Sequence, residues 1–176
     1  VQGPIEVLLP FLTRERFDDA EATFGFLLAA YGIGGAIGSL TVSSLKLPRR
    51  YLTFMILCWG GGTLPLVLIC AATNLIVMLA ALFVVGAATG AGVVIWGTLL
   101  QRLVPIEMIG RVASLDFFVS IAFMPVSIAI AGPLSLLVPI PVILIVAGIV
   151  PPVLAVIALG AGRMRAVERT HPLDTH

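Results

Sequence analysis

Five long apolar runs constrain this chain more than any other feature of its sequence. Each run is predominantly apolar over about 20 residues or more, the length that an α-helix needs to cross the hydrocarbon core of a bilayer. Polar or turn-forming stretches separate the runs, which cover residues 23–45, 51–72, 75–100, 115–138 and 141–162. The sequence therefore predicts an all-α fold, a polytopic bundle of transmembrane helices in contact with lipid.

The charge content excludes a water-soluble domain. Only 11% of the residues are charged and 60% are hydrophobic, whereas soluble domains carry roughly 25% charged residues. A soluble core of this size could not hide so much apolar surface from water. The formal net charge is +1 and no basic patch carries interleaved aromatic residues, so the sequence indicates no nucleic-acid partner.

The sequence contains few residues that could serve enzyme catalysis or bind a metal. Both histidines, His171 and His176, lie in the polar tail, and the two cysteines, Cys58 and Cys70, share one apolar run. Their spacing on a helix corresponds to about 18 Å, too far for a disulfide. No nucleophile–base pair is evident, so we expect neither an enzyme nor a bound metal or cofactor.

The opening segment is apolar but short. Residues 1–13 are long enough for about half of a bilayer, so we interpret them as part of a first crossing whose beginning the chain has lost. A re-entrant segment is the alternative. The expected bundle then covers residues 1–162 with six crossings, and residues 163–176 form a polar cytoplasmic tail.

Basic residues alternate between the two sides of the expected bundle. The positive-inside rule assigns the connections rich in lysine and arginine to the cytoplasm. These residues are Lys46, Arg49, Arg50, Arg102, Arg111, Arg163, Arg165 and Arg169. The opposite side has only Arg14 and Arg16, which neighbouring acidic residues offset. We therefore expect both chain ends in the cytoplasm and the bundle in the plasma (inner) membrane.

The polar stretch QRLVPIEMIGRV, residues 101–112, is interpreted as a cytoplasmic hairpin between two crossings. Pro105 and Gly110 are expected to end the helices where the chain turns. Asp116 then lies at the start of the next helix, where an acid is favourable near the positive end of the helix dipole. A second interpretation makes Asp116 part of a cytoplasmic gate that pairs with Arg111 or another arginine.

Small residues form ridges on two of the expected helices. Ala30, Gly34 and Gly38 follow one another at intervals of four residues, and Gly86 and Gly90 repeat this spacing. Such ridges let membrane helices approach closely, so they predict helix packing contacts. A dinucleotide-binding loop would need a preceding strand and a soluble βαβ unit, and the sequence indicates neither.

Three side chains stand out from their apolar surroundings. Glu6 is a carboxylate deep in an apolar segment, and an acid near the bilayer centre costs about 2.5–3.5 kcal/mol on insertion scales. We expect it to face the bundle interior or water, as a proton or cationic-substrate site. The alternatives are a structural hydrogen bond to a neighbouring helix and an interfacial acid in a differently placed segment. Trp59 could line a cavity or pack on nearby glycines, and Trp96 is interpreted as an interfacial aromatic residue.

Several stretches resemble the C-terminal half of a major facilitator superfamily transporter. The segment GPIEVLLPFLTRERFDDAEATFGFLLAAYGIGGAIGSL is similar to helices seven and eight of the branch that contains macrolide and siderophore exporters. GSLTVSSLKLPRR resembles the superfamily's glycine-to-basic loop motif between helices eight and nine, but it lacks the aspartate of the full motif. QRLVPIEMIGRVAS resembles the branch's loop between helices ten and eleven.

This resemblance implies one half of a twelve-helix major facilitator fold and proton-coupled efflux of an amphipathic small molecule. The substrate, whose identity the sequence does not indicate, would bind between this half and a missing N-terminal half or a second copy. Glu6 and Trp59 are then candidates for proton coupling or substrate contact. Candidates for a cytoplasmic loop or gate are Lys46, Arg49, Arg50, Arg102, Arg111 and Asp116. The alternative is a non-transporting membrane subunit or a truncated remnant of such a transporter.

Overall fold

The computed structural model describes residues 2–45, 51–72 and 74–160, and within these ranges it is built from helices without a strand. The all-α prediction is therefore confirmed for the described part of the chain. In chain order, the elements are α1 (Gln2–Arg16), α2 (Ala20–Ser44), α3 (Tyr51–Ile56), the π-helical segment η1 (Leu57–Gly61), α4 (Pro65–Ala71), α5 (Leu75–Leu103), α6 (Ile106–Leu137) and α7 (Ile140–Gly160).

Within the described ranges, five helical stretches are long and apolar enough to cross a membrane, and each contains or largely overlaps one of the predicted runs. They are Ala20–Ser44, Tyr51–Cys70, Leu75–Leu103, Ile106–Ile130 and Ile140–Gly160. The protein is thus a multi-pass membrane protein. The first helix, α1, has 15 residues, or about 22 Å, which is less than a full hydrocarbon core. The predicted basic loop (Lys46, Arg49, Arg50) and the tail lie outside the described residues.

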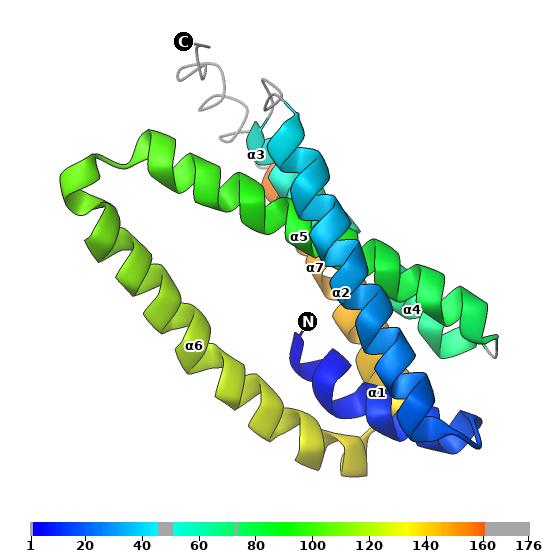
Figure 1. Cartoon of the computed structure of the whole chain (residues 1–176). Helices are drawn as coiled ribbons and strands as arrows, with labels where there is room; N and C mark the ends of the chain where they lie inside the picture. Colours follow the sequence, from blue (N-terminus) through cyan, green and yellow to red (C-terminus); the bar gives the residue numbers. More distant parts are fainter. Residues whose placement is uncertain (1, 46–50, 73, 161–176) are drawn as a thin grey trace.

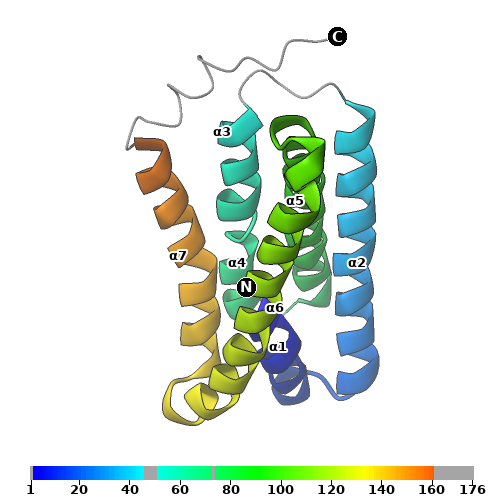
Figure 2. The same cartoon turned by 90° about the vertical axis from the view of Figure 1, so that its left-hand side faces the viewer.

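Most of the helices form one bundle around the pair α2 and α5. These two helices make the most extensive contact of the structure, and α4 packs against both α5 and α7. Figure 2 shows α2, α5, α3–α4 and α7 running roughly side by side, with α1 at one end of the bundle. The main core draws buried side chains from five helices, including Leu9, Leu27, Leu66, Leu82 and Leu144. A smaller core joins α3 to the end of α5 through Tyr51, Met55, Ile95 and Leu99.

The two small-residue ridges meet inside the α2–α5 contact. A Cβ atom added at Gly34, Gly38, Gly86 or Gly90 would collide with a backbone carbonyl of the facing helix. The absence of a side chain at these positions therefore sets how closely the two helices approach. Ala30, the first member of the α2 ridge, is half-buried.

The hairpin between α5 and α6 is shorter than the sequence predicted. Only Val104 and Pro105 separate the two helices, and Gly110 lies inside α6. Asp116 is ten residues beyond the first residue of α6, Ile106, so the prediction that it begins a helix is wrong. One glycine inside a helix costs only about 1 kcal/mol relative to alanine, whereas Pro105 lacks an N–H and disfavours helical geometry in the residue before it.

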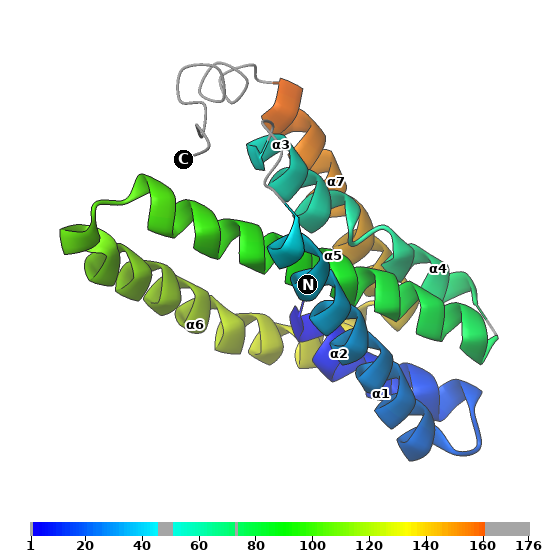
Figure 3. The ribbon, with the colours of Figure 1, turned by 45° about the horizontal axis from the view of Figure 1, so that its top comes forward.

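The helix α6 stands apart from the rest of the bundle. Figures 1 and 3 show α5 and α6 diverging from their shared hairpin, and α6 makes its main contact with α1 rather than with α5. None of the described side chains in the apolar window of Ile106–Ile130 is buried. This helix therefore depends on few contacts for its position.

Candidate functional site

The helix that begins at Tyr51 is interrupted within its membrane-length stretch. α3 continues into the π-helical η1, a turn follows at residues 62–64, and Pro65 opens α4. Three consecutive glycines, residues 60–62, make the backbone permissive here, and proline is favoured in the first turn of a new helix. Short π-helical segments occur frequently at functional sites, so the surroundings of η1 form the candidate site.

Thr63 connects this interruption to α7. Its side chain is buried, and Oγ1 lies 2.8 Å from the carbonyl oxygen of Gly60 and 3.1 Å from that of Gly148. In a regular helix the N–H of residue 152 would donate to that second carbonyl, but Pro152 has no N–H. The hydroxyl of Thr63 therefore supplies a donor that α7 lacks, as membrane helices require where proline frees a backbone group.

Trp59, in the middle of η1, lies against α5. Its indole rests on Gly92, where an added Cβ would collide with the ring atoms Nε1 and Cδ1. The centroid of the ring is 6.3 Å from that of Trp96, and the two rings are tilted by 46°, an arrangement typical of interacting aromatic pairs. Trp59 thus packs on a glycine of another helix, and 40% of its surface stays exposed.

Trp96 links this aromatic pair to a carboxylate. Its Nε1 donates a hydrogen bond of 3.2 Å to Oδ2 of Asp116 on α6. Asp116 is about 15 Å along α6 from its first residue, within a stretch apolar enough to span a membrane. Among the described residues it forms no ion pair, with Arg111 or with any other cation. The site therefore joins two indoles and one carboxylate that has no charged partner among the residues that the structure describes.

Arg16 has a role that the sequence analysis missed. Its guanidinium donates to three carbonyl oxygens at the end of α4, those of Ile69 (3.0 Å), Cys70 (2.9 Å) and Ala72 (2.7 Å). The last carbonyls of a helix have no partner within it, and a positive charge there also favours the helix dipole. A basic residue in the last turn of α1 signals a cap for α1 itself, and no local pattern connects it to a helix 53 residues away.

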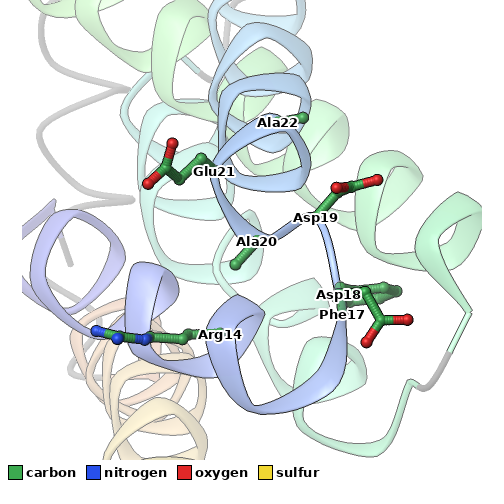
Figure 4. A pocket seen from close by; sticks show the side chains of 7 residues that line it. All are labelled: Arg14, Phe17, Asp18, Asp19, Ala20, Glu21 and Ala22. Carbon is green, nitrogen blue, oxygen red and sulfur yellow. The ribbon is translucent and has the colours of Figure 1, made fainter.

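A shallow hollow of about 400 Å³ lies at the turn between α1 and α2, and charged side chains surround it. Figure 4 shows Arg14 and Glu21 pointing to one side of the turn, and Asp18 and Asp19 to the other. All four are exposed. They do not converge on a common point, so the hollow is a solvated loop surface.

The structure brings together two of the sequence-predicted candidates, Trp59 and Asp116, through Trp96. Arg102 is exposed near the end of α5, six residues after Trp96, and it makes no hydrogen bond to the described residues of this cluster. Glu6 lies in α1, but its side chain is outside the described part of the structure. No protein-family model, curated protein or solved structure matches this chain.

Proposed function

We propose that this protein is the C-terminal half of a proton-coupled exporter of the major facilitator type, with an amphipathic small molecule as its substrate. The observation that supports this most is Asp116, an ionisable side chain within an apolar, membrane-length helix. Ionisable residues in membrane helices are costly, and in transporters they mark the path of ions or substrates. The hydrogen bond from Trp96 holds this carboxylate at the aromatic pair that Trp96 forms with Trp59 of η1.

The interrupted helix supplies a second reason. Discontinuous membrane helices are a recurring feature of substrate and ion sites in transporters. Here the interruption is joined to α7 by Thr63 and to α5 by Trp59, so a rearrangement at residues 60–64 would reach both helices. In this proposal both chain ends face the cytoplasm of a plasma membrane, and a second set of helices completes the substrate site.

Inside-out membrane vesicles that contain the protein together with the set of helices that completes its substrate site provide the test. A fluorescent amphipathic dye should accumulate when a proton gradient is imposed, and the accumulation should disappear when a protonophore collapses the gradient. Asp116→Asn should lower the initial rate by about tenfold or more at equal protein level. The matched control is Glu107→Gln, which changes an exposed acid on the same helix and should leave the rate unchanged. Dye movement that ignores both the gradient and Asp116→Asn would refute the proposal in favour of a non-transporting membrane subunit.

A further inference from the structure

We propose that Trp59, Trp96 and Asp116 form a binding site for a weakly hydrated organic cation, such as a quaternary ammonium or phosphonium ion. As a statement about the exported substrate, the inference rests on the proposed function. As a statement about binding, it depends only on the three side chains and the helices that hold them.

The charge of Asp116 requires a partner that the described part of the chain does not provide. One oxygen of its carboxylate accepts the hydrogen bond from Trp96, and no described lysine or arginine pairs with it. A carboxylate in apolar surroundings is strongly unfavourable unless a positive charge or a proton compensates it. A bound cation would provide this compensation.

The composition of the site selects the kind of cation. Calcium requires six to eight oxygen ligands, and magnesium keeps an octahedral shell of oxygens, whereas this site holds one carboxylate beside two apolar rings. Indole faces attract cations within about 6 Å of the ring centroid, and they recognise quaternary ammonium groups in particular. The tilt of 46° between Trp59 and Trp96 presents two faces that are not parallel, which suits a rounded, apolar cation better than a flat one.

Backbone geometry fixes the aromatic wall before a ligand arrives. Trp59 occupies the space where any residue other than glycine at position 92 would carry a Cβ, and Asp116 holds the indole of Trp96 through its N–H. Trp59 remains 40% exposed, so part of its surface is open to a ligand. Gly92 is in this sense a positioning residue, because it acts on the ligand only through Trp59.

The chain contains only two tryptophans, Trp59 and Trp96, so tryptophan fluorescence, excited selectively over that of tyrosine, reports on this site. The purified full chain, in an uncharged maltoside detergent, is titrated with tetraphenylphosphonium. We expect a saturable fluorescence change, and a dissociation constant about tenfold or more higher in Asp116→Asn. Asp116→Glu should bind within about threefold of the unchanged protein, since the charge is kept, and Glu107→Gln should bind as the unchanged protein does.

Two further measurements separate charge recognition from apolar adsorption. Triphenylphosphine oxide, a neutral molecule of similar shape, should bind about tenfold or more weakly than tetraphenylphosphonium. Gly92→Ala should weaken binding of the cation although Asp116 is intact. This variant tests the proposal independently if circular dichroism shows that Asp116→Asn does not fold. Equal binding of the neutral and cationic probes, or unchanged binding in a folded Asp116→Asn protein, overturns the proposal.

The cation could come from the headgroup of a lipid or from a free molecule, because both carry the same ammonium chemistry. Phosphatidylcholine, whose headgroup is a quaternary ammonium, distinguishes them when it is added to the micelles: displacement of tetraphenylphosphonium identifies the headgroup, and undisturbed binding identifies a free cation. The vesicle assay separates this site from the exporter function. Cation binding without gradient-driven transport refutes the exporter and supports the site, whereas transport without cation binding refutes the site alone.

Discussion

Replacing Gly34 with alanine is expected to push α2 and α5 apart. The new Cβ would lie 3.0 Å or less from three backbone atoms of Phe83, and a backbone carbonyl inside a helix cannot turn away as the end of a side chain can. The two helices must therefore separate along their most extensive contact. Overpacking of this kind costs about 1–3 kcal/mol of folding free energy.

Gly32 provides a matched control on the same helix. A Cβ added there meets nothing within 4 Å. Both substitutions gain the helix propensity of alanine over glycine, about 1 kcal/mol, so this gain cancels when the two variants are compared. Gly32→Ala should equal or exceed the original protein in stability, and Gly34→Ala should be about 1–3 kcal/mol less stable than Gly32→Ala.

The measurement is unfolding in mixed micelles with increasing sodium dodecyl sulfate, followed by tryptophan fluorescence and by circular dichroism. The free energies of unfolding of the two variants are compared at the same detergent composition. If Gly34→Ala proves as stable as Gly32→Ala, α2 and α5 do not pack through this ridge, and the reasoning from the glycine spacing fails.

Three other perturbations have defined outcomes. Arg16→Gln should lower the free energy of unfolding by about 2–3 kcal/mol, because it removes charged donors from the end of α4; Arg14→Gln, an exposed neighbour, should have little effect in the same detergent titration. Thr63→Val should cost about 0.5–1.5 kcal/mol, since the carbonyl of Gly148 loses the hydroxyl that donates to it, whereas Thr63→Ser should recover most of this loss. Single cysteines introduced into a protein without its native cysteines should report the topology: positions 18, 74 and 139 should label from outside, and positions 49, 106 and 171 from inside. Labelling of positions 18 and 49 from the same face would contradict the topology.

The sequence was sufficient for features that depend on one helix at a time. Span lengths follow from runs of apolar residues, because each helix must satisfy its own backbone in lipid. The ridge positions follow from a spacing of four residues, which places Gly34 and Gly38 on one face of α2. The prediction from sequence is wrong at the α5–α6 hairpin for a local reason. It uses Gly110 as a helix end, although a single glycine is too weak a signal to end a helix, and Gly110 lies inside α6.

Features that join distant helices could not be predicted in the same way. Nothing near Trp59 indicates that it will rest on Gly92, and nothing near Trp96 indicates that it will donate to Asp116. Arg16 carries the ordinary signal of a basic residue at the end of its own helix, yet it caps α4. These contacts depend on which helices become neighbours, and a periodic pattern in one helix carries no information about its neighbour.

The two side chains that hold the interrupted helix solve the same physical problem. Arg16 supplies donors to the last carbonyls of α4, which have no partner within their own helix, and Thr63 supplies one to the carbonyl of α7 that Pro152 leaves unpaired within an apolar span. The interrupted helix is thereby fixed at its far end and at its break.

In contrast, α6 meets α5 through few contacts beyond the hairpin, and the hydrogen bond from Trp96 to Asp116 is one of them. A cation that takes over the carboxylate would compete with this hydrogen bond, so occupation of the proposed site would act first on the position of α6 and only then on the rest of the bundle.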